Sequence, residues 1–353
     1  MTPDVNAAVA RALVIHAPHD LRLEDQAVSP LGPREIAVRI GAGGICGSDL
    51  HYFHNGGFGA VRLKEPMILG HEVAGTVERV GAEVGSVKPG DRVAVSPSRP
   101  CGHCRYCQEG RQNHCLNMRF YGSAMPFPHI QGAFREVLVC DAVQAHKVAD
   151  GVSLGEAAFC EPLAVCLHAV RRAGPLLGKR VLVTGCGPIG ALCVLAARAA
   201  GAAEIVATDI APATLAVVKG LGVATTLNTA EDPDALKAYE ADKGHFDVLF
   251  EASGNMKALT GAFAALRPGA VIVQVGTGGD FTIPISVLVA KEFELRGTFR
   301  FHEEFATAVQ MIGERRIDVR PLLTATLPME QAVEAFHLAS DRSKAMKVQI
   351  AFG

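Results

Sequence analysis

Two patterns of apolar and polar residues divide the chain. Up to about residue 160, short apolar runs such as 36–40 and 72–80 are rich in Val, Ile and Gly and are separated by Gly and Pro. Such runs are typical of β-strands. From residue 181, apolar runs alternate with Ala- and Leu-rich stretches such as 189–200 and 214–221, which have helical character. The first part is therefore predicted to be β-rich, and the second to be an α/β structure.

Six apolar runs in the second part are candidate strands. Because helical stretches lie between them, they predict a parallel, doubly wound sheet. The end of the chain adds two amphipathic helices and a last strand. The candidate strands are 181–184, 204–208, 223–227, 246–251, 270–275 and 292–297, the late helices are 303–313 and 329–340, and the last strand is 345–351.

Length and charge narrow the class of protein. A chain of 353 residues is longer than a typical domain of ~150, so two domains are expected. The composition, 49% hydrophobic and 20% charged, is that of a folded protein. The 34 Lys and Arg nearly balance the 36 Asp and Glu, so the chain has no overall basic field for nucleic acid.

The longest uncharged stretch, 181–197, does not read as a membrane span. It contains Gly185, Gly187, Pro188 and Gly190, which predict a strand, a turn and a helix start. The apolar run 12–15 is too short for a signal peptide. We therefore expect a cytoplasmic protein without a membrane partner.

Four of the ten cysteines are crowded into one turn-rich segment. Cys101, Cys104, Cys107 and Cys115 have the spacing C-x2-C-x2-C-x7-C. Four thiolates this close in sequence can converge on a tetrahedral zinc ion and leave no open coordination position, so the predicted role is structural. A zinc ribbon that binds nucleic acid is the alternative, but no run of Lys and Arg flanks the segment.

A glycine-rich hexapeptide predicts a dinucleotide site. The motif G-x-G-x-x-G follows a predicted strand and opens a helix, where backbone amides can face a pyrophosphate. Asp209 lies 19 residues beyond the last glycine (209 − 190) and can accept hydrogen bonds from ribose hydroxyls. Its charge would repel a 2′-phosphate, so NAD is expected over NADP. The predicted cofactor-binding residues are Gly185, Gly187, Pro188, Ile189, Gly190 and Asp209.

A second group of ligand-type residues lies outside the four-cysteine segment. Cys46 precedes Ser48, Asp49 and His51, and the pair His71 and Glu72 follows Gly70; Glu161 comes later in the chain. A Cys, a His and a carboxylate can hold zinc and leave a fourth position for water or substrate. By spacing alone, packed core residues are an equal alternative.

Together these motifs resemble the zinc-dependent medium-chain alcohol and polyol dehydrogenases, in which they occur in the same order. The resemblance extends over essentially the whole chain. It implies a GroES-like, β-rich catalytic domain of residues 1–162 and 301–353, with the structural zinc lobe near 100–115. A Rossmann NAD-binding domain of residues 163–300 would lie between the two catalytic segments.

Carried over onto this sequence, the family pattern makes Cys46, His71 and Glu72 ligands of a catalytic zinc. Glu161 would approach the metal directly or through water, with Cys160 as a rival. A glutamate at 161, where ordinary alcohol dehydrogenases have a cysteine, resembles the sorbitol dehydrogenase branch. Asp49 is expected to hydrogen-bond the distal nitrogen of His71.

The resemblance also implies a reaction. Zinc would favour the alkoxide of a secondary alcohol, and hydride would pass to NAD. Ser48 and His51 match positions that form a relay for the alcohol proton in relatives. The predicted catalytic residues are Ser48, His51 and Glu161. A catalytically silent sensor that binds NAD and zinc remains the alternative from a different class.

Polar residues at positions that line the cleft in polyol-handling relatives indicate the substrate. Two arginines suit a carboxylate, and thus a sugar acid. Segments 96–104 and 117–125 resemble the L-idonate 5-dehydrogenase group, which implies oxidation of L-idonate to 5-keto-D-gluconate; sorbitol or xylitol remains the alternative. Relatives are dimers or tetramers, so a homo-oligomer is expected. The candidate substrate residues are Tyr52, His54, Arg119, Tyr121 and Arg300.

Overall fold

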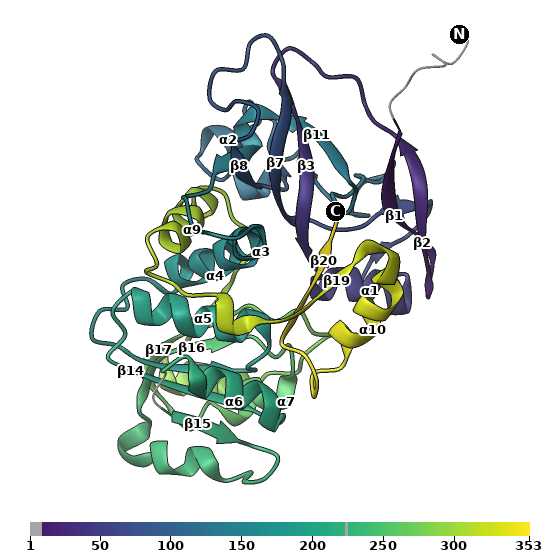
Figure 1. Ribbon diagram of the computed structural model, residues 1–353. Coiled ribbons are helices and arrows are strands. Elements are labelled where there is room, and N and C mark those ends of the chain that lie inside the picture. The colour runs from purple at the N-terminus through teal and green to yellow at the C-terminus, as the bar shows by residue number, and fades with distance from the viewer. Residues whose placement is uncertain (1–8, 223–224) are drawn as a thin grey trace.

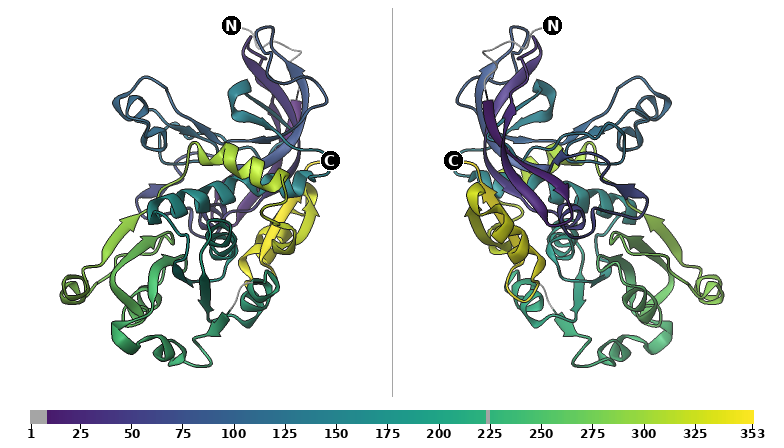
Figure 2. Two further views of the ribbon diagram at one scale, coloured as in Figure 1. Left: turned by 90° about the vertical axis from the view of Figure 1, so that its left-hand side faces the viewer. Right: turned by 90° about the vertical axis from the view of Figure 1, so that its right-hand side faces the viewer.

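The computed structural model describes residues 9–222 and 225–353 (Figure 1). Its strands form a β-rich part, in the upper half of Figure 1, and a parallel sheet in the lower half. Figure 2 shows from the side that the segment with α2 (Arg105–Gln108) projects from the β-rich part. In the described ranges, no helix is long and apolar enough to cross a membrane.

A seven-stranded sheet forms the centre of the β-rich part. Its order is β12-β8-β7-β3-β20-β19, with β11 also paired to β3. The last strand, β20, runs antiparallel to β3 and places Ile350 opposite Gly43. The end of the chain therefore completes a sheet that begins near its start. The strands are β3 (Glu35–Gly44), β7 (Glu72–Val80), β8 (Arg92–Val95), β11 (Val137–Asp141), β12 (Ala145–Lys147), β19 (Leu323–Pro328) and β20 (Lys347–Ala351).

Smaller sheets surround this centre. β1 pairs with β2 and β6, β4 pairs with β5, and β9 pairs with β10 on either side of the four-cysteine segment. Besides α2, this part has the helices α1 (Gly47–Asn55), α3 (Leu154–Ala158) and α10 (Ala332–Ser340). The strands are β1 (Val9–Ala17), β2 (Asp20–Ala27), β4 (Gly57–Phe58), β5 (Val61–Arg62), β6 (Met67–Ile68), β9 (Ser98–Arg99) and β10 (Arg119–Phe120).

The second sheet is parallel throughout, with the order β15-β14-β13-β16-β17-β18. The strand order reverses between β13 and β16, which is where doubly wound sheets bind ligands, at the carboxyl ends of the strands. Its strands are β13 (Arg180–Thr184), β14 (Glu204–Asp209), β15 (Thr225–Asn228), β16 (Phe246–Glu251), β17 (Leu266–Gln274) and β18 (Glu294–Gly297), and its helices are α5 (Pro188–Ala199), α6 (Pro212–Gly220), α7 (Met256–Gly261) and α8 (Ile285–Lys291).

The predicted α/β fold, with a GroES-like β-rich part and a Rossmann sheet, is confirmed, and the differences lie at element ends. The strand predicted at 292–297 begins at Glu294, because Glu292 ends α8 in a left-handed conformation (φ 51°). The helix predicted at 329–340 is a 3₁₀ turn, Met329–Gln331, followed by α10. Of the strand predicted at 223–227, positions 223 and 224 lie outside the described residues.

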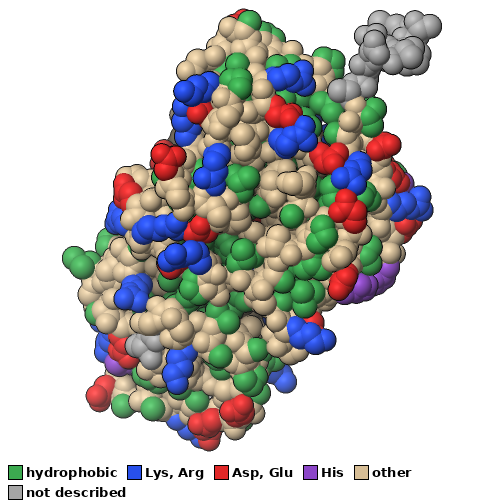
Figure 3. Space-filling view, viewed as in Figure 1, with side chains coloured by type: hydrophobic (Ala, Val, Ile, Leu, Met, Phe, Trp, Pro, Cys, Tyr) green, Lys and Arg blue, Asp and Glu red, His purple; other side chains and the backbone are tan. Residues whose placement is uncertain are grey.

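Charges of both signs are interspersed over the surface that Figure 3 shows. This arrangement agrees with the net charge of −2. It gives that face no single-sign field of the kind that attracts a phosphate backbone.

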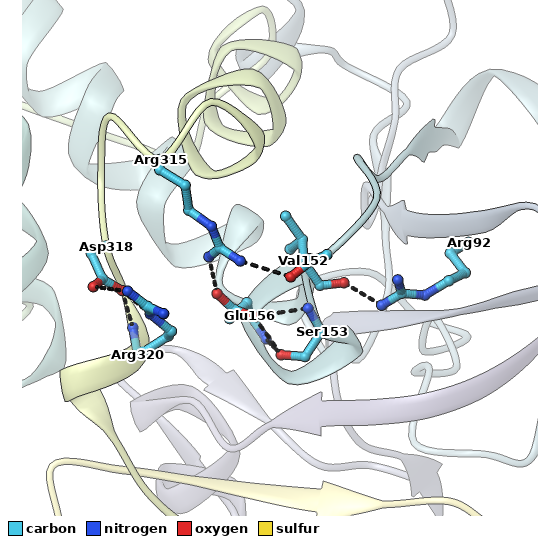
Figure 4. A network of polar contacts seen from close by, with 8 residues as sticks. Arg92, Val152, Ser153, Glu156, Arg315, Asp318 and Arg320 are labelled. Atoms are coloured by element: carbon cyan, nitrogen blue, oxygen red, sulfur yellow. Dashed lines mark hydrogen bonds and ion pairs between the residues drawn. The ribbon is translucent and has the colours of Figure 1, made fainter.

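A polar network fixes the helix pair that leads toward the predicted metal site (Figure 4). Ser153 caps α3 and accepts from the Glu156 amide at 3.1 Å, while the Glu156 carboxylate accepts from the Ser153 amide at 2.8 Å. Arg315 binds the Glu156 carboxylate and donates to the carbonyl of Gly151 at 2.7 Å. The segment after α9 (Glu304–Gly313) therefore holds the start of α3, and α4 (Cys160–Ala173) follows directly.

Glu304 connects α9 to α4. Its carboxylate contacts the Nδ1 of His168 at 2.9 Å and accepts from the His302 amide at 3.0 Å. Burial acts to raise the pKa of Glu304, but these hydrogen bonds outweigh it and lower that pKa to about 2. The ionised carboxylate therefore stabilises the fold at pH values above 4.5, the ordinary pKa of a glutamate. This contribution is lost as the pH falls from 4.5 toward 2.

We expect Glu304→Gln to reduce the free energy of unfolding at pH 7 by roughly 2–3 kcal/mol, since one pKa unit corresponds to about 1.4 kcal/mol. Denaturant titrations at several pH values measure the free energy of unfolding of the parent and the variant. The difference between the two should become smaller as the pH falls below 4.5. The exposed neighbour Glu303, which pairs with Arg171 on the surface, provides the control Glu303→Gln. A difference for Glu304→Gln that stays constant down to pH 3 would contradict this assignment.

Candidate active site

Cys46, His71 and Glu72 meet where one central strand ends and its neighbour begins. Cys46 caps the N-terminus of α1, two residues after the end of β3, and Glu72 is the first residue of β7. The register of the two strands places Gly44 opposite Glu72. One ligand atom from each of Cys46, His71 and Glu72 lies within 4.8 Å of the others, so the three can share a single ion.

Gly44 is required for this approach. A Cβ at residue 44 would lie 2.2 Å from Oε2 of Glu72. No side chain can occupy that space while the carboxylate is there, so the absence of a Cβ lets Glu72 turn toward Cys46.

The electrostatics of these buried groups favour a cation. Burial, together with the charge of Glu72, raises the pKa of Cys46 to about 12, so the thiolate needs a positive charge beside it at neutral pH. Nδ1 of His71 is buried and has no hydrogen-bond partner among the residues that the structure describes. A soft thiolate, an imidazole and a carboxylate are the donors that zinc accepts in catalytic sites. These residues therefore fit a zinc ion.

Glu161 faces this cluster from the first turn of α4. It is buried, and burial raises its pKa to about 8, helped by the negative charges of Glu72 and Cys46 and opposed by His71. It lies outside the group of three close ligands. Cys160, the rival, is part of the hydrophobic core, where burial raises the pKa of its thiol. The charges of the cluster act on Glu161, whereas Cys160 packs in the core, so Glu161 is the better candidate for the residue near the metal position.

Lys347, which the sequence reasoning missed, also belongs to the cluster. It is the first residue of β20, and its Nζ lies 2.5 Å from Oε2 of Glu72 and 2.9 Å from the carbonyl oxygen of Ile45. Both side chains of the ion pair are almost fully buried, at 4% and 1% exposure. The only available signal was a lysine inside an apolar strand pattern.

Asp49 supports the ligands through their backbone. Its carboxylate accepts from the amides of Cys46, at 3.0 Å, and Gly70, at 3.2 Å. The expected hydrogen bond to the ring of His71 is not formed, because Oδ1 of Asp49 and Nδ1 of His71 are 3.9 Å apart. Asp49 therefore holds together the two segments that carry the ligands.

The other candidate polar residues lie at varied positions. Ser48 and His51 are three residues apart on α1, so they lie on the same side of the helix. The buried hydroxyl of Tyr52 accepts from the Ala124 amide at 3.0 Å. His54 contacts the hydroxyl of Ser340 at 2.7 Å, and the Tyr121 hydroxyl donates to Gln144 at 3.2 Å.

Arg300 lies close to the cluster, whereas Arg119 is exposed on β10. The guanidinium of Arg300 is 4.1 Å from the ring centroid of Phe120, and the Phe120 ring is 5.6 Å from that of His71. Burial lowers the pKa of Arg300 to about 10, against the opposite effect of Glu161, so Arg300 stays charged at neutral pH. A half-buried cation thus stands beside the predicted metal site.

The four cysteines of the lobe also converge. Cys104 Sγ lies 3.5 Å from the sulfur of Cys107 and 3.9 Å from that of Cys115. Four thiolates at ~2.3 Å around a tetrahedral ion would be ~3.8 Å apart. Backbone amides lower the pKa of Cys101 to about 5, which favours its thiolate. Cys101, Cys104, Cys107 and Cys115 form one group of possible ligands.

The glycine-rich turn opens α5 at the carboxyl end of β13. Gly190 is packed so tightly that a Cβ would lie 1.7 Å from the carbonyl oxygen of Gly185. Gly187 caps the helix, Pro188 and Ile189 begin it, and a Cβ on Gly187 would meet nothing within 4 Å. Open space at a helix N-terminus suits a pyrophosphate.

Asp209 lies beside this turn at the end of β14. Its carboxylate accepts from the amides of Cys186 at 2.5 Å, Ile210 at 2.7 Å and Ala211 at 2.9 Å. These donors fix the carboxylate next to the glycine-rich turn.

Comparison with known proteins identifies the family. The model of the alcohol dehydrogenase GroES-like domain matches residues 32–150, and the model of the zinc-binding dehydrogenase matches residues 188–314. The chain belongs to the zinc-dependent medium-chain dehydrogenases. Within that family it lies in the polyol dehydrogenase branch.

Relatives of this branch match nearly the whole length of the chain. L-idonate 5-dehydrogenase (NAD(P)(+)) of Escherichia coli is 43% identical over 316 residues, which are 89% of this chain and 91% of that protein. Human sorbitol dehydrogenase is 37% identical over 92% of this chain and 91% of its own. A crystal structure of the Escherichia coli L-idonate 5-dehydrogenase superposes with a TM-score of 0.93 at 40% identity, covering 98% of both chains.

Lys347→Met should destabilise this medium-chain dehydrogenase once its metal has been removed by a chelator. The substitution leaves Glu72 as an uncompensated buried charge, which costs about 3–5 kcal/mol. Chemical denaturation of the chelated parent and variant measures the difference. Lys344→Met, which breaks an exposed ion pair with Asp341, is the matched control and should change the stability by less than about 0.5 kcal/mol. Equal losses for both variants would refute the role of Lys347.

Proposed function

We propose that this dehydrogenase transfers hydride from a secondary alcohol of a sugar acid or polyol to NAD, with L-idonate oxidised to 5-keto-D-gluconate as the preferred reaction. The observation that carries the proposal is the placement of a charged arginine, Arg300, beside the cluster of Cys46, His71 and Glu72. The identity to L-idonate 5-dehydrogenase supports the substrate. The assay is NADH formation with a panel of aldonic acids and polyols.

Cys46, His71 and Glu72 would hold the catalytic zinc in this proposal. When bound, zinc supplies the positive charge that lets an alcohol lose its proton near neutral pH. Glu161 would face the metal directly or through a water molecule. Its pKa of about 8 allows it to hold or release a proton in the neutral range. Asp49 and Lys347 keep the ligand segments and the Glu72 carboxylate in place.

Ser48 and His51 would carry the alcohol proton outward. They lie on one side of α1, whose first residue follows the ligand Cys46. His51 is exposed, so its ring can exchange a proton with solvent. An imidazole suits this outer position because its ordinary pKa is near neutrality.

The proposed cofactor is NAD, bound by the glycine-rich turn and Asp209. The carboxylate of Asp209 stands at the end of β14, where doubly wound sheets bind the adenosine ribose. No arginine follows Asp209 in the next residues to hold a 2′-phosphate. The Escherichia coli relative is named for both NAD and NADP, so kinetics with both cofactors test this choice.

We expect the parent to have a higher kcat/KM with NAD than with NADP, and Asp209→Asn to narrow that ratio roughly 10-fold, which corresponds to ~1.4 kcal/mol of repulsion removed. Asn keeps the size of the side chain and one oxygen acceptor for the turn. Steady-state kinetics with both cofactors measure this ratio for the parent and the variant. A parent that prefers NADP would overturn the assignment.

Arg300 is the proposed carboxylate clamp of the sugar acid. Its loss should remove a charge-assisted contact of roughly 1.5–3 kcal/mol, or about 10- to 100-fold in kcat/KM for L-idonate. The kcat/KM for sorbitol and xylitol should fall less, because their neutral hydroxyls make weaker hydrogen bonds to the guanidinium. Arg300→Gln tests this expectation, and Arg119→Gln is its comparison, since Arg119 is exposed. Equal losses on acid and polyol for Arg300→Gln would rule out the clamp.

A neutral polyol is the second candidate substrate. It is favoured by the 37% identity to human sorbitol dehydrogenase, and the metal and cofactor proposals would be the same. Tyr52, His54 and Tyr121 remain candidate residues for binding its hydroxyls. In the structure their polar atoms form hydrogen bonds within the protein, to Ala124, Ser340 and Gln144 respectively.

We also propose a structural zinc in the lobe, held by Cys101, Cys104, Cys107 and Cys115.

We further propose that the chain divides into a catalytic domain of residues 1–162 and 301–353 and an NAD-binding domain of residues 163–300. The joint sheet of β3 and β20 supports that division. A homo-oligomer is supported by β18, the last strand of its sheet, beside the exposed Ile285, Val289 and Leu295. The ten free thiols support a cytoplasmic location.

A further inference from the structure

We propose that the four-cysteine lobe positions Arg300, and that Asn113 is the positioning residue through which it acts. This proposal rests on the proposed function, in which Arg300 binds the carboxylate of the substrate. The lobe would then contribute to the choice between a sugar acid and a neutral polyol.

The first contact joins the lobe to the residue before Arg300. Asn113 lies in the 3₁₀ turn Gln112–His114, two residues before the lobe ligand Cys115. Its side chain is buried, at 9% exposure, and its Nδ2 donates to the carbonyl oxygen of Phe299 at 3.0 Å. The ring of His114 stacks on that of Phe299, with centroids 6.0 Å apart and planes at 26°. The lobe therefore holds both the backbone and the ring of Phe299.

The backbone of Arg300 needs such support. Its φ is 53°, in the left-handed region that residues with a Cβ rarely adopt. A residue keeps such a conformation when the surrounding structure holds it there. The peptide that begins at the Phe299 carbonyl, which Asn113 binds, is the one that leads into Arg300.

The base of the lobe also supports the guanidinium. Phe120 belongs to β10, which follows the lobe and pairs with β9 in front of it. Arg300 lies over the Phe120 ring at 4.1 Å, and its Nη2 donates to the sulfur of Met125 at 3.4 Å. The same Phe120 ring contacts His71 of the metal cluster. The lobe thus holds Arg300 at both ends, and Phe120 sets its distance from the metal site.

A clamp that is displaced by about 1 Å loses much of its effect on the reaction. Releasing Phe299 should therefore weaken the binding of a carboxylate without removing the arginine. Polyol oxidation, which does not use the clamp, should change little.

The test compares Asn113→Asp and Asn113→Ala with the parent on L-idonate and on sorbitol, with Arg300→Gln and the double variant Asn113→Asp/Arg300→Gln alongside. Asp has nearly the shape of Asn but cannot donate to the Phe299 carbonyl. Gln108→Glu makes the same change of amide to carboxylate at an exposed position of the lobe and is the matched control. Metal content and Tm are measured for every variant.

We expect both Asn113 variants to lower kcat/KM for L-idonate roughly 5- to 10-fold, mainly through KM, and that for sorbitol less than about 2-fold. The double variant should be no worse on L-idonate than Arg300→Gln alone, since the two residues act through one contact. Gln108→Glu should match the parent.

Equal losses on both substrates, or an Asn113 effect that adds fully to that of Arg300→Gln, would overturn the positioning role and leave the lobe a purely structural element. If Arg300→Gln lowers selectivity for the acid and the Asn113 variants do not, this inference alone is wrong. If Arg300→Gln itself leaves selectivity unchanged, the proposed clamp is wrong, and the positioning role is wrong with it.

Discussion

The gathering of the half-buried Cys46 and the buried His71, Glu72 and Lys347 in one small space is the constraint on which the rest of the structure depends. Ionisable groups that lose their water must find opposite charge or neutralise. Glu72 has Lys347, at 2.5 Å, while burial raises the pKa of the Cys46 thiol to about 12. At neutral pH this thiol stays protonated, and Cys46 can be held as a thiolate only when a further cation joins the cluster. A zinc ion would supply that charge.

The topology of the β-rich part follows from assembling this cluster. β3 and β7 must pair in a register that places Gly44 opposite Glu72, because the carboxylate fills the space a Cβ would need. The last strand must return to β3, because it brings Lys347 to Glu72. Residues from opposite ends of the chain therefore contribute to one site. α4 then brings Glu161 to the cluster and packs against α5, the helix that the glycine-rich turn opens.

The sequence predicted the parts of the site that depend on local motifs. The four lobe cysteines and the glycine-rich turn could be found because each is a local motif with a diagnostic spacing, whereas Cys46 and the pair at 71–72 were assigned only through the resemblance to the family. The parallel sheet could be found from the alternation of strands and helices. Lys347 could not be assigned to the site, because its contact with Glu72 spans 275 positions (347 − 72) and leaves no local pattern. The expected bond from Asp49 to His71 is not formed: the carboxylate accepts from two backbone amides, and its Oδ1 lies 3.9 Å from Nδ1 of His71.

The most direct test of this account is the number of zinc ions bound per chain in the purified protein and in two single variants. Elemental analysis should find two zinc ions in the parent and one each in Cys46→Ser and Cys104→Ser, because each variant removes a ligand from a different site. Loss of activity should accompany the zinc missing from Cys46→Ser. A parent with fewer than two zinc ions, or a Cys46→Ser variant that keeps both, would contradict the account.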